Sequence, residues 1–349
     1  MKTLFGLTSV ELRGWAQSQG MPAFRGQQIA DWLYRKGAES FAAMTNLPLD
    51  LRGRLSQSAD LGHLPVVARA VSDDRTIKLL LARRDGEQVE SVGLPYPDRV
   101  ACCLSSQVGC PIGCTFCATG LSGFTGNLDA GEIVAQVLAV QRELGQRVSH
   151  VVFMGMGEPL LNYDAVLKSV RLLNEEVGVA MRHITVSTVG LVPQMRRLAD
   201  ERLQLTLAVS LHAPTNELRH ELVPGTRGFT VEEIVNAAKL YATTTGRRVT
   251  FEYVLLRGVN DRPAEARALA KLLRDCYCHV NLIPFNPVDD TGFQAPTLRA
   301  VRHFRNLLEA AKITVTQRVQ RGASADAACG QLRRRLTTAK FAVSSEPRT

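Results

Sequence analysis

The sequence contains no run of about eighteen or more apolar residues, and its start, MKTLFGLTSVELRGWAQ, turns polar too early for a signal peptide. It also lacks internal repeats and low-complexity tracts. These absences argue against a membrane-spanning or secreted protein. We therefore expect a globular, cytoplasmic protein without a membrane partner. Its 349 residues, 45% of them hydrophobic, are enough for one large domain and a smaller one.

The eight cysteines predict metal or redox chemistry rather than disulfides, because the cytoplasm keeps thiols reduced. Three of them form the pattern C-x3-C-x2-C in CPIGCTFC, at Cys110, Cys114 and Cys117. A closed zinc site usually has four ligands, and the next cysteines, Cys276 and Cys278, lie about 160 residues away. A 4Fe-4S cluster held by three cysteines leaves one iron open to a cofactor, and this spacing is typical of radical S-adenosylmethionine (SAM) enzymes. Structural zinc and three incidental cysteines are the alternatives.

From Arg99 onward, apolar runs of strand character alternate with amphipathic stretches of helical length. The strand-like runs are VACCLSS, VVFMGM, ITVST, LTLAVSLH, VTFEYVLL, HVNLIPFN and TVTQRV. About six such units favour an α/β fold with a partial or full (β/α) barrel, and a doubly wound sheet is the alternative. In both folds a site lies at the carboxyl ends of the strands, where GMGEP, ST, SLH and NP gather polar residues.

The chain divides into four segments. The pattern Thr8-x-x-Glu11 predicts a capping box at the start of a helical N-terminal region, and the strand-like runs VVARAV, TIKLLLA and VESVGL follow that region. We predict a helical accessory domain at residues 1–62, a small β linker element at 63–98, a radical SAM barrel domain at 99–343 and a frayed tail at 344–349.

Several motifs outside the cysteine pattern point to one family. The stretch CLSSQVGCPIGCTFCATGLSGFTGNLDAGEI resembles the RlmN/Cfr family of radical SAM RNA methyltransferases, as do FMGMGEPLLNY, STVG, SLHAP, NLIPFNP, DAACGQL and PAFRGQQIADWLYRKG. The pair GEPL and PFNP is similar to the RlmN branch, which methylates adenosine at C2, and unlike the Cfr branch, which methylates C8. The chain departs from the branch pattern at Gly126, in residues 223–229 and in residues 323–325.

The resemblance implies two cofactors and the residues that hold them. The three clustered cysteines would hold the 4Fe-4S cluster, and two SAM molecules would be used per turnover. A glycine lets the backbone approach a ligand, and a carboxylate can accept the SAM amino group, which favours Gly157 and Glu158 on chemical grounds as well. The other residues that match SAM contacts are Ser187, Ser210, Leu211, His212 and Asn286. Taken alone, His212 would more commonly be a histidine at the edge of the core.

Three further residues match catalytic positions. The resemblance implies that Cys329 carries the methyl group and that Cys103 frees the product by forming a disulfide with Cys329. It also implies that Glu90 is the active-site base. Adjacent side chains on a strand point to opposite faces, so only one of Cys102 and Cys103 can face the site, and the spacing to Cys110 selects Cys103. By residue type alone, each thiol would more commonly serve packing, and Glu90 would be a solvated strand residue.

The charge of the chain favours a polyanionic partner, since the net charge is +9 and the pI is near 9.3. Between Arg318 and Lys340 the basic residues face a single acidic one, Asp326, and Cys329 lies among them. We therefore predict that this run binds RNA phosphate. Its basic residues are Arg318, Arg321, Arg333, Arg334, Arg335 and Lys340.

The resemblance also implies the partners. The substrate would be an adenosine in the peptidyl-transferase region of 23S ribosomal RNA and, in many relatives, also the adenosine 3′ of the transfer RNA anticodon. A low-potential electron donor such as flavodoxin or ferredoxin would reduce the cluster. We expect the protein to be a monomer.

Three other functions stay open at this point. A Cfr-like enzyme would methylate adenine at C8. A radical SAM enzyme for a different RNA, a peptide or a small molecule would keep the cluster motif but would not need Cys103 or Cys329. A non-enzymatic iron-sulfur or zinc RNA-binding protein would need a fourth ligand and would not cleave SAM.

Overall fold

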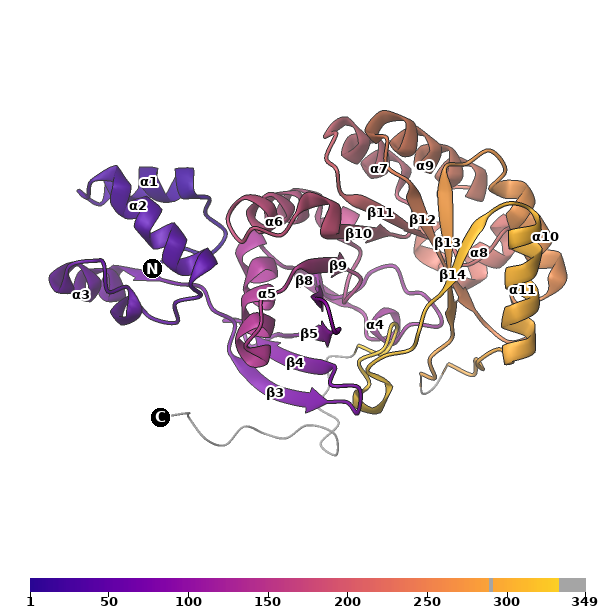
Figure 1. Ribbon diagram of the computed structural model, residues 1–349, viewed down its shortest axis with the longest axis horizontal. Coiled ribbons are helices and arrows are strands. Elements are labelled where there is room, and N and C mark those ends of the chain that lie inside the picture. Colours follow the sequence, from indigo (N-terminus) through magenta and orange to yellow (C-terminus); the bar gives the residue numbers. More distant parts are fainter. Residues whose placement is uncertain (289–290, 333–349) are drawn as a thin grey trace.

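The computed structural model describes residues 1–288 and 291–332 (Figure 1). The predicted tail at 344–349 and the end of the predicted barrel domain lie outside the described residues. The same is true of four residues of the predicted phosphate-binding run, namely Arg333, Arg334, Arg335 and Lys340. No described helix is long and apolar enough to cross a membrane.

The first sixty residues form a helical unit beside the rest of the chain (Figure 1). It contains α1 (Ser9–Ser18), α2 (Ala23–Ala30), the π-helical turn η1 (Asp31–Arg35), the 3-10 turn η2 (Phe41–Ala43) and α3 (Leu49–Ser58). The predicted capping box is present at the start of α1, where Thr8 and Glu11 each accept a hydrogen bond from the backbone of the other. A parallel pair of short strands, β1 (Lys2–Thr3) and β2 (Ala59–Asp60), joins the two ends of the unit.

A ten-stranded sheet forms the body of the protein. In spatial order it consists of β3 (Val66–Val71), β4 (Ile77–Ala82), β5 (Gln88–Pro95), β6 (Val100–Cys103), β9 (His150–Phe153), β10 (Ile184–Thr188), β11 (Thr206–Ser210), β12 (Val249–Leu255), β13 (Cys278–Pro284) and β14 (Thr314–Gln317). The pairs from β6 to β14 are parallel, and the pairs from β3 to β6 are antiparallel. The strand order never reverses, so the doubly wound alternative is wrong. Within the described residues β3 and β14 each have one neighbour, and the barrel is therefore partial.

The three strands of residues 63–98 continue the sheet of the barrel instead of standing apart as a linker. Val92 on β5 pairs directly with Cys103 on β6. Leu79, Leu80 and Leu81 on β4 are completely buried in succession, which requires cover on both faces of the sheet. A strand buried on both faces needs the interior of the barrel on one face and other elements on the other. The sequence pattern alone does not show which elements these are.

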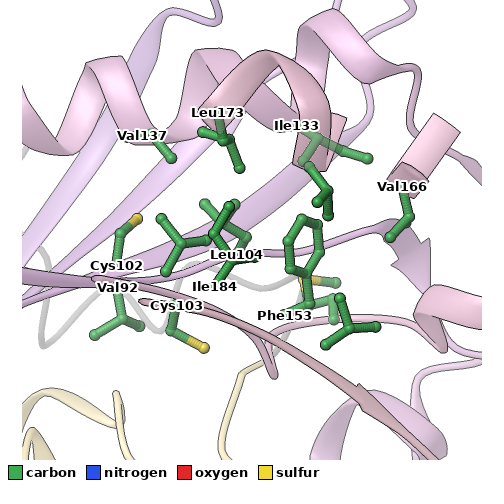
Figure 2. Close-up of a cluster of buried hydrophobic side chains, with 14 of the residues drawn as sticks. Val92, Cys102, Cys103, Leu104, Ile133, Val137, Phe153, Val166, Leu173 and Ile184 are labelled. Atoms are coloured by element: carbon green, nitrogen blue, oxygen red, sulfur yellow. The ribbon is translucent and has the colours of Figure 1, made fainter. Parts of the chain in front are cut away.

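Helices cover the outer face of the parallel strands (Figure 1). They are α5 (Ala130–Leu144), α6 (Tyr163–Glu175), α7 (Val192–Asp200), α9 (Val231–Thr245), α10 (Pro263–Leu272) and α11 (Leu298–Ala310). The short helix α8 (Asn216–Leu222) lies instead at the carboxyl ends of β10 and β11. Figure 2 shows the Cys102 side chain on the same side of its strand as Val137 and Leu173 of these helices, and the Cys103 side chain on the opposite side. Cys102 therefore belongs to the packed layer between sheet and helices, and Cys103 points into the barrel.

A glycine in the helical unit gives a testable consequence of its packing. A Cβ atom on Gly26 in α2 would collide with the backbone of Leu12 and Arg13 in α1, whereas Gly14 in α1 has open space around it. We expect Gly26→Ala to destabilise the unit by about 1–3 kcal/mol through overpacking. We expect Gly14→Ala to stabilise it by about 0.5–1 kcal/mol, because alanine loses less backbone entropy in a helix.

Tryptophan fluorescence during denaturant unfolding measures both effects, since the protein's two tryptophans, Trp15 and Trp32, lie in this unit. Equal unfolding midpoints for Gly26→Ala and Gly14→Ala would contradict the close helix crossing.

Candidate active site

The three clustered cysteines lie on a loop that follows β6 at the carboxyl end of the strands. The antiparallel strands β7 (Gln107–Gly109) and β8 (Phe124–Asn127) hold the two ends of this loop together, and the short helix α4 (Ala118–Leu121) follows Cys117. The Cys110 N–H donates to the Gly123 carbonyl at 2.8 Å, and the Cys117 N–H donates to the Cys114 carbonyl at 3.1 Å. The fold of the loop thus sets the spacing of the thiols.

Most of the predicted site residues line one cavity, which we call the cluster cavity. They are Cys110, Cys114, Cys117, Gly157, Glu158, Ser187, Ser210, His212, Asn286 and Cys329. They come from the ends of β9, β10, β11 and β13, from the cysteine loop and from the segment after β14. Leu211 differs from the others, because it is completely buried and is absent from the lining.

The donor set of the cysteine loop fits an iron-sulfur cluster, because its three thiols line one cavity. In the described part of the chain no three His, Cys, Asp or Glu side chains converge to hold one metal ion. A cluster of four irons presents a different iron to each thiolate, so its ligands need only surround one cavity. Burial raises the pKa of the Cys110 thiol to about 12 and also raises the pKa of Cys117. Bound metal would have to displace these protons.

The carboxylate of Glu158 is held by two backbone groups. Its oxygens accept hydrogen bonds from the N–H of Leu160 at 2.9 Å and from the N–H of Val189, after β10, at 2.8 Å. Burial raises its pKa to about 7. Gly157 has a φ of +101°, and a Cβ there would lie 2.6 Å from the Cβ of Gln107. A buried carboxylate in this position can accept hydrogen bonds from a cationic amino group.

His212 supports the aromatic residue of the cysteine loop. Its ring meets the Phe116 ring edge to face, with 5.0 Å between centroids. Its Nδ1 accepts a hydrogen bond from the Val254 N–H at 3.1 Å, and burial lowers its pKa to about 3. The imidazole is therefore neutral at physiological pH, with Nδ1 as the acceptor and its proton on Nε2.

Cys329 lies in the wall between the cluster cavity and a second cavity. The second cavity also contains Cys103, and we call it the Cys103 cavity. The Cys329 carbonyl accepts a hydrogen bond from Asn286 Nδ2 at 2.9 Å, and the Gly330 carbonyl accepts one from Ala118 N–H at 2.8 Å. These bonds join the segment after β14 to the cysteine loop and to the loop after β13.

Glu90 is completely buried, so it is not the solvated strand residue that its type alone would suggest. It lies on β5 two residues before Val92, and both side chains therefore face the barrel interior. Its carboxylate lies 3.3 Å from Lys78 Nζ, which also donates to the Asp326 carbonyl at 3.1 Å. Glu90 is not among the described residues that line the two cavities.

Two arginines of the predicted phosphate-binding run, Arg318 and Arg321, lie in the described part of the chain. Arg318 lines both cavities. Arg321 forms a salt bridge of 3.1 Å with Asp74 and lies over the Tyr96 ring, 4.5 Å from its centroid. Arg321 is therefore already paired within the protein, whereas Arg318 faces the two cavities, and phosphate binding by this run stays a prediction.

Sequence reasoning missed three buried polar residues around the site. Glu252 on β12 lines both cavities and accepts a hydrogen bond from Asn281 at 2.8 Å; a lone carboxylate in the apolar run VTFEYVLL was a usable signal. Asn260 donates to the carbonyls of His212 and Val254 and so joins the ends of β11 and β12. Arg219 on α8 is completely buried, and the sequence of its helix gave no signal for this.

Comparison with known proteins identifies the family. Residues 2–61 match the ribosomal RNA large subunit methyltransferase N-terminal domain, and residues 104–270 match the radical SAM superfamily. The chain is 50% identical over 330 residues to the probable dual-specificity RNA methyltransferase RlmN of Thermosynechococcus vestitus, covering 95% of this chain and 98% of that relative. It is 52% identical over 340 residues to the protein of the same name from Prochlorococcus marinus, covering 95% and 96%.

A solved structure agrees with these relatives. The crystal structure of a radical SAM methyltransferase from Sphaerobacter thermophilus superposes with a TM-score of 0.93 at 48% identity, covering 96% of this chain and all of that one. The radical SAM superfamily implies a 4Fe-4S cluster and SAM as cofactors, which the cysteine loop and the cluster cavity fit. Relatives this similar over nearly the whole chain show that it belongs to the RlmN family of radical SAM RNA methyltransferases.

Proposed function

We propose that this chain methylates C2 of an adenosine in the peptidyl-transferase region of 23S ribosomal RNA, and of the adenosine 3′ of the transfer RNA anticodon, through a methyl group carried on Cys329. The observation that carries the proposal is the position of Cys329 between the cluster cavity and the Cys103 cavity. A sulfur that first takes a methyl group from SAM and later meets a second thiol needs access to both. The dual-specificity RNA methyltransferases that the chain resembles support RNA as the substrate.

In this proposal Cys110, Cys114 and Cys117 hold the cluster, and Glu158, Ser187, Ser210 and Asn286 hold SAM. When bound, the cluster supplies the electron that cleaves SAM. The fixed carboxylate of Glu158 accepts hydrogen bonds from the SAM amino group, since its two backbone donors already set its orientation. One SAM supplies the methyl group and a second supplies the radical, so two are used per turnover. A radical derived from SAM would take one hydrogen atom from the methyl group on Cys329, and the resulting methylene radical would add to C2 of the adenine. The adduct would then lose the C2 proton and one electron, which would return to the oxidised cluster.

Product release then depends on two thiols. The Cys103 thiolate attacks the Cys329 sulfur, the bond from that sulfur to the methylene carbon breaks with its electron pair left on the carbon, and a disulfide forms. The carbon takes a proton and becomes the methyl group of the product. An external thiol reductant must return this disulfide to two thiols before the next turnover. We propose that Glu90 is the base that accepts the adenine proton. Lys78 pairs with Glu90 and donates to the Asp326 carbonyl, so it links Glu90 to the segment that carries Cys329.

RNA must reach a site inside the barrel. The target adenine has to leave its stack, which takes on the order of a few kcal/mol and suits loops and junctions. We propose that the helical unit at residues 1–62 is the RNA-binding accessory domain, because residues 2–61 match the N-terminal domain of ribosomal RNA methyltransferases. A monomer acting in the cytoplasm and a flavodoxin or ferredoxin as the electron donor complete the proposal.

The position of the methyl group is the direct test. Reconstituted enzyme supplied with SAM, a reductant and 23S ribosomal RNA fragments should produce 2-methyladenosine, detected by mass spectrometry of the digested RNA against authentic standards. Transfer RNA should give the same nucleoside. Methyl found only at C8 would overturn the C2 assignment, and methylated peptide with unmodified RNA would overturn RNA as the substrate.

Replacement of any cluster cysteine tests the metal assignment. Cys110→Ala, Cys114→Ala and Cys117→Ala should each have less bound iron, because each removes one thiolate ligand. Each should also lose the visible absorption bands of the cluster and the cleavage of SAM. Cys276→Ala is the matched control and should keep all three, since Cys276 lies at the opposite end of the barrel, just before β13. Full iron content in any of the three loop variants would contradict the three-ligand site.

Replacement of Cys329 should block the reaction at its start, and replacement of Cys103 should block it at product release. Cys329→Ala lacks the methyl carrier and should form neither product nor adduct. Cys103→Ala should still carry out the addition to adenine and then accumulate a covalent protein-RNA complex, visible as a nuclease-sensitive shifted band on a denaturing gel.

Cys102→Ala is the control for this experiment, because the Cys102 side chain packs against the helices on the other face of β6 (Figure 2). It should turn over normally and trap nothing. A trapped complex with Cys102→Ala and normal turnover with Cys103→Ala would reverse the assignment.

A further inference from the structure

Arg219 is a completely buried cation beside the cysteine loop. Within residues 1–288 and 291–332, its guanidinium donates hydrogen bonds only to backbone carbonyls, those of Val189, Ser210 and Leu211, at the carboxyl ends of β10 and β11. Its Nε is buried without a hydrogen-bond partner in the described residues. No carboxylate of the described chain forms a salt bridge with it, in contrast to Lys78, which pairs with Glu90. An uncompensated charge in this position is unfavourable for the fold by itself.

The charges around Arg219 belong to the site. Its electrostatic partners are Cys114 and Glu158, both in the lining of the cluster cavity. Burial lowers its pKa to about 10, so the guanidinium still carries its charge at neutral pH. Of its two partners, Cys114 becomes negative only when its thiol gives up its proton to a bound cluster, so cluster binding would add negative charge to the surroundings of Arg219.

The helix that carries Arg219 is also bonded to the cysteine loop. The Leu222 carbonyl at the end of α8 accepts a hydrogen bond from Thr115 N–H at 3.1 Å, and Gly225 N–H donates to the Ile112 carbonyl at 3.0 Å. A Cβ on Gly225 would lie 2.7 Å from the Ile112 Cα, so the two backbones approach closely. Gly225 thus fixes the segment after α8 against the cysteine loop. The Arg219 side chain is therefore fixed to the strand ends by its own hydrogen bonds, and its helix is fixed to the cysteine loop by the backbone.

We propose that Arg219 is the built-in counter-charge of the cluster, a positioning residue that favours the reduced state by placing a fixed positive charge beside the Cys114 thiolate. The inference rests on the proposed function in one respect, the cluster on the three cysteines. Reduction adds one negative charge to the site. A nearby cation in a poorly solvated interior stabilises that added charge, and the net charge around a cluster is one determinant of its potential.

The charge can be separated from the hydrogen bonds by two substitutions. Arg219→Lys keeps a cation and loses the planar fork, whereas Arg219→Gln keeps an amide donor and loses the charge. Arg247→Gln is the matched control. Arg247 also has a buried Nε without a hydrogen-bond partner in the part of the chain that the structure describes, and it donates to Thr206, which lies at the opposite end of β11.

The measurement is an EPR-monitored redox titration of the anaerobically reconstituted full chain without RNA, with iron content and melting temperature measured in parallel. At the potential where half of the wild-type cluster is reduced, Arg219→Gln should lower the ratio of reduced to oxidised cluster at least about tenfold, which is 59 mV for one electron. Arg219→Lys should change that ratio by less than roughly threefold, and Arg247→Gln should leave it unchanged.

Each outcome decides the matter. Arg219→Gln with full iron content and an unchanged midpoint potential overturns the inference. If Arg219→Gln loses the cluster and Arg219→Lys keeps it, the charge is needed for assembly, which supports the inference. Loss of cluster or fold in both variants overturns it, because hydrogen-bond geometry and not charge would then be what the site requires. Wild-type protein that takes up no cluster would contradict the proposed function instead.

Discussion

The hydrogen bonds of β6 to its two neighbours determine where the reactive groups lie. On one side β6 pairs antiparallel with β5, and on the other side it pairs parallel with β9. This four-residue strand is thus the point at which an antiparallel meander becomes a parallel barrel. Its last residue, Cys103, faces the interior, and the chain that leaves it forms the cysteine loop. A one-residue slip of β6 would turn Cys103 toward the helices and Cys102 toward the cavity.

The charged groups around the site are buried and are held mostly by the backbone. Glu158 receives two backbone N–H groups, and Arg219 gives its hydrogen bonds to three backbone carbonyls. The main chain costs no additional side-chain entropy when it acts as a partner, and it fixes the direction of each charge. The arrangement suits a site where charge changes during turnover, because the surrounding dipoles are already oriented before the change.

Much of this fold could be predicted because its signals are local. The strands and helices of the barrel follow hydrophobic periodicity. The alternation of side chains on a strand showed that only one of Cys102 and Cys103 can face the interior, and the spacing to Cys110 selected Cys103. The role of residues 63–98 could not be predicted in the same way. VVARAV, TIKLLLA and VESVGL look alike as a free hairpin or as an extension of a sheet, and only the pairing of Val92 with Cys103 distinguishes the two.

Charged residues that are buried in the folded protein could not be predicted either. Arg219 lies in a helix whose other charged residues are not buried. The neighbouring sequence gives no signal that the Arg219 side chain ends beneath the site. Glu90 looked like a solvated residue for the converse reason, since its burial comes from a sheet that the local pattern does not reveal. Sequence patterns report the neighbours along the chain, whereas the electrostatic environment of a charge depends on neighbours across the fold.

The partial barrel has a further consequence. The gap between β14 and β3 is crossed by the segment after β14, which bonds to Asp74 through Arg321 and to Lys78 through the Asp326 carbonyl (Figure 1). The same segment carries Cys329. Where other barrels close with a ladder of strand hydrogen bonds, this one closes with a few side-chain contacts and a loop. Cys329, the proposed methyl carrier, is therefore part of the seam of the barrel, so the same few contacts fix this residue and keep this side of the barrel closed.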